Sequence, residues 1–169
     1  MIIDVSQIVG KPGRSLDFSK DMTIENTVCY PDVVDFLKPV KIEGKITNTE
    51  GILGMNAKGT TRVAMQCSRC LSPVEVDVEF YLNENFKATG DISEEDFIGF
   101  SGDEIDITEI VMDAVHIATP MKVVCDDDCK GLCPSCGKNL NEGDCGCDNT
   151  YINPKFASLR SLFKDDEEV

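Results

Sequence analysis

Eight of the nine cysteines in this chain have the close spacing of metal-binding thiols. Two of them form the motif Cys67-Ser68-Arg69-Cys70, and six more follow after 54 intervening residues: Cys125, Cys129, Cys133, Cys136, Cys145 and Cys147. Four thiolates complete the tetrahedral shell of one zinc ion, and such a closed shell is structural because it keeps no open position for a substrate. The spacing therefore predicts two zinc ions, with one ion as the alternative, and a scaffold instead of an active site.

The spacing also favours one grouping of the cysteines. The run Cys133-Pro134-Ser135-Cys136-Gly137 has the form of a knuckle, in which two thiolates reach one ion from a tight turn. Its complement is Cys145-Gly146-Cys147, where Gly146 must provide a sharp bend if both cysteines bind the same ion. An alternative is that Cys145 or Cys147 is not a direct ligand. The remaining four thiols then form a site that cross-links distant parts of the chain: Cys67, Cys70, Cys125 and Cys129.

Other chemistries of the cysteines are an iron–sulfur cluster, a metal store, and an enzyme such as a thiol oxidoreductase or a metal-dependent hydrolase. A redox pair at Cys67 and Cys70 should open a helix in a βαβ unit, but these residues lie between two segments of alternating pattern. Cys29 stands alone and is expected to be a small buried side chain. His116 is the only histidine, has no paired nucleophile, and is expected at a surface or interface. We therefore expect no catalytic residue and no small-molecule substrate.

The segment from Lys38 to Phe86 must position the first cysteine pair. Apolar and polar residues alternate over 40–46, turn residues follow at 48–51, and residues 52–66 continue as a second strand with irregular glycines. Residues 74–82 show the cleanest alternation. The pattern predicts an antiparallel meander with one buried face and with Cys67 and Cys70 in the turn between its second and third strands. Residues 2–9 and 22–28 are candidate edge strands.

One helix is predicted between the meander and the later cysteines. Asp106 and Glu109 have the spacing of a capping box, and Pro120 ends the helical pattern. The apolar face of this helix should pack on the sheet and consists of Ile107, Ile110, Val111, Ala114, Ile117 and Ala118. Residues 87–105 are interpreted as an acidic loop or mobile linker. A second short helix is predicted from Pro154, with Asn153 before it and with an apolar side made by Phe156, Leu159, Leu162 and Phe163.

Together these elements predict an α+β fold, with an antiparallel β-sheet or partly open barrel, packed helices and a C-terminal, zinc-ribbon-like, cysteine-rich module. Residues 1–119 would form the β core with its acidic linker and helix. Residues 120–169 would form the zinc-binding module with its short C-terminal helix, packed on the core through the shared metal site.

The chain is strongly acidic. Its formal net charge is −15, and residues 91–119 carry nine acidic and no basic side chains. A field of this sign repels phosphate, so a basic protein partner fits better than nucleic acid bound over the whole surface. No apolar run approaches the roughly 18 residues of a membrane span, and Met1-Ile2-Ile3-Asp4 lacks the basic start of a signal peptide. We expect a cytoplasmic protein without membrane contact, a setting in which clustered thiols bind metal more often than they form disulfides.

The cysteine-rich sequence resembles the bacterial YceD family over about residues 35–165. The resemblance rests on the knuckle from Cys67 to Leu71 after a strand, the helix from Asp106 to Pro120, and the run from Cys129 to Asn141. Residues 153–159 look like the closing helix of the family. Family members are large ribosomal RNA subunit accumulation proteins, with relatives in plastids. Some relatives keep the first knuckle and lack the second cysteine cluster, which suggests that the site containing Cys67 is the common one.

The resemblance implies a role in the synthesis, processing or stability of 23S ribosomal RNA during assembly of the large subunit. We therefore expect a non-enzymatic, zinc-binding adaptor whose partners are ribosomal RNA, a basic large-subunit ribosomal protein, or both. In this hypothesis the acidic segment binds the basic protein. The zinc module presents four basic side chains to RNA: Arg62, Arg69, Lys130 and Lys138.

Overall fold

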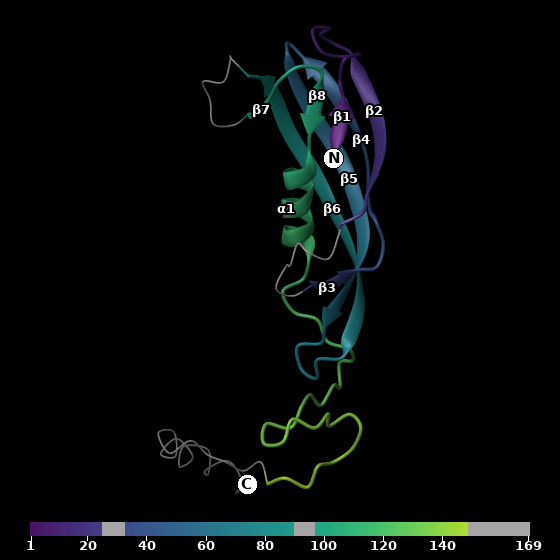
Figure 1. The fold of residues 1–169 in the computed structure, drawn as a ribbon, viewed down its shortest axis with the longest axis vertical. Coiled ribbons are helices and arrows are strands. Elements are labelled where there is room, and N and C mark those ends of the chain that lie inside the picture. The colour runs from purple at the N-terminus through teal and green to yellow at the C-terminus, as the bar shows by residue number, and fades with distance from the viewer. Residues whose placement is uncertain (25–32, 90–96, 149–169) are drawn as a thin grey trace, which may run out of the picture.

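The computed structural model describes residues 1–24, 33–89 and 97–148, and this part of the chain is mostly sheet with one helix (Figure 1). Its centre is the predicted antiparallel meander of β4 (Val40–Thr49), β5 (Ile52–Gln66) and β6 (Pro73–Ala88). Three shorter strands extend it. These are β2 (Ser15–Met22) beside β4, β3 (Val33–Phe36) beside the end of β5, and β7 (Ile98–Phe100), which runs parallel to β6. The sheet is open, because β2 and β7 end it and no strand among the described residues closes it into a barrel.

The hairpin between β4 and β5 shows how the sequence sets the register. Thr49 pairs with Ile52, so only Glu50 and Gly51 connect the two strands. Both connecting residues have positive φ angles, 55° and 93°, as a two-residue hairpin turn that follows the strand twist requires. Asn48 fixes the turn, because its side-chain oxygen accepts a hydrogen bond from the Gly51 N–H at 3.0 Å. The predicted turn at residues 48–51 is therefore confirmed.

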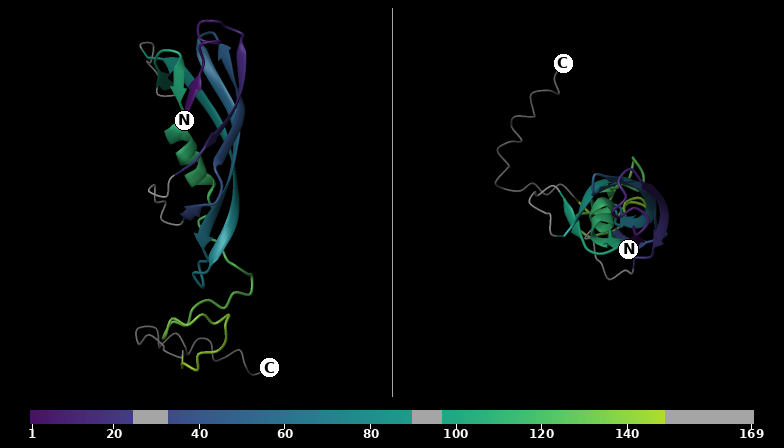
Figure 2. Two further views of the ribbon diagram at one scale, coloured as in Figure 1. Left: turned by 45° about the vertical axis from the view of Figure 1, so that its right-hand side comes forward. Right: turned by 90° about the horizontal axis from the view of Figure 1, so that it is seen from above.

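The inner face of the sheet is covered by a second layer. This layer contains helix α1 (Thr108–Ala118) and the antiparallel pair of β1 (Ile2–Asp4) and β8 (Glu104–Asp106). Figure 2 shows α1 and this pair on the same side of the curved sheet. Ile3 and Ile105 from the strand pair join Val111 and Val115 from α1 in one buried cluster with the sheet residues. The alternation along the strands thus supplies one continuous apolar core.

The helix differs from the prediction in its start and in its buried face. No capping box forms: Ile107 precedes the helix without a side-chain cap, and Asp106 instead accepts a hydrogen bond from the Thr108 N–H at 2.9 Å. Val115 is fully buried, whereas Ile117, which the pattern placed on the buried face, is 82% exposed. The rest of the predicted face is confirmed, because Ile107 and Val111 are buried in the core and Ile110, Ala114 and Ala118 are partly buried against it.

Other expected elements are corrected or lie outside the described residues. The segment 87–105 is not all linker, because β7 and most of β8 lie in it. The N-terminal edge strands are residues 2–4 and 15–22, whereas most of the expected strand at 22–28 lies outside the described residues. The second helix, expected from Pro154, also lies outside them. None of the described helices is long and apolar enough to cross a membrane.

Candidate metal centres

Four sulfur atoms from two distant parts of the chain gather at one end of the sheet. Cys67 and Cys70 lie in the turn between β5 and β6, and Cys125 and Cys129 follow α1. Their sulfurs all lie within 4.8 Å of one another. Cys67 Sγ is 3.9 Å from Cys129 Sγ, and Cys70 Sγ is 3.5 Å from Cys125 Sγ. The structure therefore brings together the four thiols that the spacing grouped, and all but Cys125 are buried.

Backbone N–H groups point at the sulfur of Cys67. Arg69 and Cys125 donate to Cys67 Sγ at 3.5 and 3.4 Å. The N–H of Cys70, followed by those of Arg69 and Cys125, lowers the pKa of Cys67 to about 6. A thiolate is the form that ligates a metal, so the turn favours the ligating state before any ion binds.

The second cluster lies entirely within the cysteine-rich segment. The sulfurs of Cys133, Cys136, Cys145 and Cys147 also lie within 4.8 Å of one another. The Cys133 N–H donates to the Lys138 carbonyl at 2.8 Å, which closes a short hairpin around the first two ligands. This cluster is more open than the first, because only Cys133 is buried and Cys136 is exposed.

Left-handed backbone shapes both clusters. Gly137 directly follows the second knuckle with φ 74°, and Leu71 takes φ 61° at the matching position after Cys70. Gly146 has φ 69°, which is the sharp bend that two ligands one residue apart require. Glycine adopts this region without steric cost, whereas Leu71 is strained there by about 1 to 2 kcal/mol. The two knuckles therefore share one backbone geometry.

The first cluster is also a junction between the sheet and the segment after α1. The Ser68 N–H donates to the Val123 carbonyl at 2.8 Å, and the Leu132 N–H donates to the Arg69 carbonyl at 3.1 Å. Gly131 is buried against the same turn, and a Cβ at this position would lie only 3.0 Å from the Arg69 carbonyl oxygen. The two parts therefore approach each other so closely that only glycine fits between them.

Arg69 strengthens this junction with its side chain. Its Nη1 donates to the carbonyls of Asp127 at 2.9 Å and Cys129 at 3.0 Å. A charged donor shared by two carbonyls fixes the loop that carries two of the four thiols. The motif at residues 67–70 thus supplies two ligands and the clamp that orders the other two.

The donor set fits tetrahedral zinc. Sulfurs about 2.3 Å from a central ion lie about 3.8 Å apart at the corners of a tetrahedron. The separations of 3.5 and 3.9 Å in the first cluster match this edge, and the eight described cysteines are free thiols. Four thiolates with no fifth donor form a closed shell, which is the structural type of site. Iron accepts four thiolates as well, so the geometry alone supports metal binding without naming the ion.

The four sulfurs of each cluster lie so close together that all four thiols can ionise only beside a cation. Hydrogen bonding with Cys70 and the other thiols raises the pKa of Cys125 to about 12, and Cys136 has the same effect on Cys147, which also reaches about 12. In the first cluster the thiols of Cys67 and Cys70, whose pKa values are lowered, thus lie beside a thiol whose pKa is raised. In the second cluster hydrogen bonding from the Cys136 backbone lowers the pKa of Cys133 to about 6, beside the raised pKa of Cys147. A divalent cation offsets this repulsion, because it stabilises the charged form of every ligand at once.

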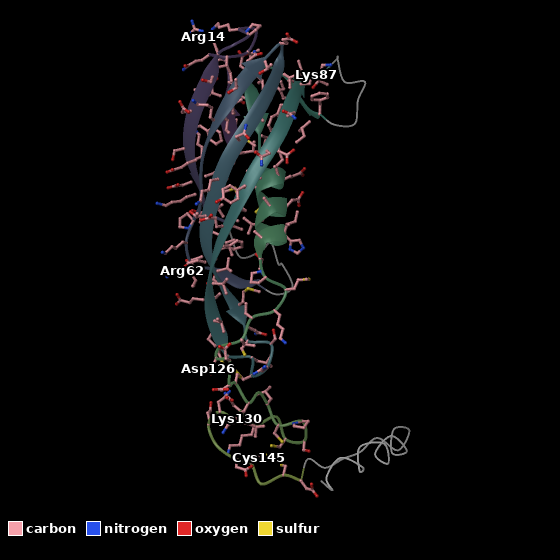
Figure 3. The ribbon with its side chains drawn as sticks, turned by 180° about the vertical axis from the view of Figure 1, so that it is seen from behind. Arg14, Arg62, Lys87, Asp126, Lys130 and Cys145 are labelled. Atoms are coloured by element: carbon pink, nitrogen blue, oxygen red, sulfur yellow. The ribbon has the colours of Figure 1, made fainter. Side chains whose placement is uncertain are left out.

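Three of the four basic side chains assigned to RNA are held by partners within the chain. Arg62 donates to both carboxylate oxygens of Asp77, at 2.6 and 2.8 Å, and Figure 3 shows it on the sheet, away from the cysteine-rich end. Arg69 clamps the metal loop, and Lys138 Nζ donates to a backbone carbonyl at 2.9 Å. Lys130 is exposed on the cysteine-rich segment. Arg62, Arg69 and Lys138 thus each have an acceptor within the chain, although Arg69 and Lys138 are also exposed to solvent.

The alternative roles that the sequence left open rest on Cys67 with Cys70, on His116 and on Cys29. Cys67 and Cys70 lie between antiparallel strands, whereas a redox pair with this spacing opens a helix. His116 is exposed on α1, and Cys29 lies outside the described residues. The sequence missed the clamp made by Arg69, because its acceptor carbonyls come from a segment 58 to 60 residues away.

Comparison with known proteins matches residues 55–163 to the family of the large ribosomal RNA subunit accumulation protein YceD. An uncharacterized protein of Mycobacterium bovis is 39% identical over 182 residues, which cover 100% of this chain and 84% of that protein. The uncharacterized protein YlbN of Bacillus subtilis is 25% identical, with 97% of both chains covered.

A chloroplast relative carries the family name. The large ribosomal RNA subunit accumulation protein YCED homolog 1 of Zea mays is 26% identical over 175 residues, which cover 84% of this chain and 58% of that protein. No solved structure gives a significant match. The family match covers nearly all of β5, together with β6, β7, the helix and both cysteine clusters, and this chain therefore belongs to the YceD family.

Proposed function

We propose that this protein is a non-enzymatic, zinc-stabilised factor that supports accumulation of 23S ribosomal RNA during assembly of the large ribosomal subunit. The observation that carries the proposal is the family match over residues 55–163, since the family is described by large ribosomal RNA subunit accumulation. The chloroplast relatives carry the same description. The protein would act in the cytoplasm, where reduced thiols remain available to metal.

Zinc is the proposed occupant of both clusters, with two ions for the eight thiols. Sulfur separations of 3.5 and 3.9 Å support a tetrahedral ion, and zinc is the ion that most often fills closed four-thiolate shells of this kind. When bound, zinc would supply charge compensation and cross-linking, not chemistry. Residues 120–169 would form the metal module, packed on the β core of residues 1–119 through the first site.

The proposed partner is a basic protein of the large subunit. The net charge of −15 favours a cationic partner, and Arg62, Arg69 and Lys138 already have acceptors inside the chain. The effect on ribosomal RNA would then pass through a ribosomal protein that the factor delivers or stabilises. Direct RNA contact through Lys130 would be a smaller contribution.

The experiment is complementation of a bacterial strain that lacks the gene. The ratio of 23S to 16S ribosomal RNA should fall in the deletion strain and return to normal with the wild-type gene. The double substitution Cys67→Ser with Cys70→Ser should fail to restore the ratio, whereas Ser68→Ala in the same turn should restore it because all ligands remain. An unchanged 23S to 16S ratio in the deletion strain would contradict the proposed function.

A further inference from the structure

Strand β6 has a free edge. One of its edges pairs with β5 from Pro73 to Phe86, but along the other edge the described residues pair with it only at Phe86–Ala88, through β7. Every second residue of a strand turns its N–H and C=O toward a given side. Alternate residues between Val74 and Asn85 therefore present main-chain groups to this side with no strand among the described residues to pair with them.

A hollow of about 550 Å³ lies between this edge and α1. Its walls are β6, Ile98 of β7, and one side of α1. The lining is mostly apolar and includes Phe80, Leu82, Ile110, Ala114 and Ile117. Ile110 and Ala114 are partly buried against the core, whereas Ile117 is 82% exposed, so the helix presents uncovered apolar surface at Ile117.

The charge of the hollow is negative. Glu84 and Asp113 line it, and no basic side chain does. The wider segment 91–119 holds nine acidic residues and no basic one. Farther along β6, Asp77 and Glu79 form ion pairs with Arg62 and Lys58, whereas Glu84 and Asp113 form no ion pair with the described residues.

We propose that the edge of β6 and helix α1 form a docking groove for an extended, basic segment of a partner protein. This segment would add to the sheet as a strand beside β6, end to end with β7. Its apolar side chains would enter the hollow at every second position, and its Lys or Arg side chains would lie near Glu84 and Asp113. Strand addition of this type takes affinity from main-chain hydrogen bonds and specificity from the pocket beside them.

Charge selects this occupant over two others. A second copy of the chain also carries a net charge of −15, so two copies repel each other at an acidic groove. Residues 149–169 of this chain carry three basic and four acidic side chains, a net charge of −1, so they bring no surplus of positive charge to the groove. The inference rests on the proposed function, since it gives the basic ribosomal partner its binding site.

The test uses the full-length, zinc-loaded protein and a labelled nine-residue peptide in which lysine and valine alternate. Fluorescence anisotropy gives the affinity, and amide chemical shifts give the location. The expected shifts fall on β6 near residues 80–85 and on α1. A peptide of the same composition in scrambled order should bind about tenfold more weakly, because its valines no longer share one face.

Backbone methylation separates strand addition from general charge attraction. N-methylation of the alternate peptide residues that face β6 should weaken binding at least about tenfold, because each methyl removes a main-chain hydrogen bond. The same number of methyl groups on the other alternate set should leave binding close to that of the parent peptide. Equal effects of the two methylated peptides would overturn the proposal.

Two pairs of variants test the groove itself. Ala114→Leu fills the hollow and should lower the affinity for the peptide, whereas Ala88→Leu at an exposed site should leave the affinity unchanged. The double substitution Glu84→Gln with Asp113→Asn should lower the affinity about fivefold. Asp21→Asn with Glu43→Gln removes the same charge from exposed sites on other strands and should have a smaller effect.

The overturning results are distinct from failure of the proposed function. Any one of three results would overturn the groove as a site for a basic partner. The peptide could shift amides on the free edge of β2, its affinity could be the same for Ala114→Leu and wild type, or dimerisation at high protein concentration could give the same shifts without peptide. If the deletion strain still loses 23S ribosomal RNA, the proposed function stands even when the groove is overturned. Conversely, an unchanged ratio of 23S to 16S ribosomal RNA in the deletion strain would refute the proposed function even if the peptide binds the groove.

Discussion

Opening the first metal site should release the segment after α1 from the sheet. The double substitution Cys125→Ser with Cys129→Ser removes two of its four ligands. In this opening the sheet and α1 stay folded, so the loop that the site closes runs from the end of α1 at Ala118 to Cys125, with six intervening residues. A cross-link across a loop of this length lowers the entropy of the open segment by an amount worth about 2 kcal/mol. The population in which the junction is open should therefore rise by about thirtyfold.

The amide of Ser68 reports this opening directly. Its N–H belongs to the turn of the sheet and donates to the Val123 carbonyl at 2.8 Å, across the junction. Hydrogen exchange should show about a thirtyfold loss of protection at Ser68, up to the limit set by global unfolding. Amides in the centre of β5, which pairs with strands on both edges, should keep their protection.

The matched control is Cys136→Ser with Cys147→Ser, which opens the second site. These ligands lie within the cysteine-rich segment, so their loss removes no link to the sheet. Ser68 should then lose much less protection than in the first variant. Equal loss at Ser68 in both variants, or full protection in the first, would refute the cross-link reasoning.

Three further predictions concern single features. Gly59→Ala should lower the free energy of unfolding by about 1 to 3 kcal/mol in thermal or urea melts, because a Cβ there would lie 2.1 Å from a ring carbon of Phe80. Arg69→Ala should speed tryptic cleavage after Lys130, because the loop loses a charged donor to two carbonyls. The zinc affinity should fall as pH is lowered from 9 to 6 in chelator competition. The reason is that Cys125 and Cys147, with pKa values of about 12, must release protons to bind.

Each of these predictions has a control. Gly54→Ala places a Cβ at an ordinary 3.4 Å from Asn85 and should cost less than Gly59→Ala. Ser68→Ala keeps the clamp and should leave the cleavage rate at Lys130 unchanged. A zinc affinity that is constant between pH 6 and 9 would mean that zinc binding releases no protons and that the ligands are not these thiols.

The sequence predicts the meander well because its signal is local. Alternation in residues 74–82 fixes which face of β6 is buried, and the turn residues at 48–51 fix the register of β4 and β5. Strands of three residues are too short to show the two-residue alternation of apolar and polar side chains. The sequence therefore does not distinguish β1, β7 and β8 from the polar segments around them. The predicted face of α1 is confirmed except at Ile117, which is exposed because this helix has more apolar residues than the core covers. Val115 is the buried residue that the pattern left out.

The cysteine groups were predictable for the same reason. A knuckle is a local turn, so Cys133 and Cys136 point to one ion whatever surrounds them. Pairing the first knuckle with Cys125 and Cys129 followed once the other four were grouped. The functions of Arg69 and Gly131 were not visible, since both depend on two distant segments meeting at the junction.

Native mass spectrometry with cysteine mapping tests directly whether eight thiols form two closed metal sites. The expected result is a mass increase of two zinc ions, protection of all eight thiols from alkylation, and, on chelation, loss of the junction between the sheet and the segment after α1. One ion or none, together with rapid alkylation of Cys67 and Cys70 in the purified protein, would contradict it.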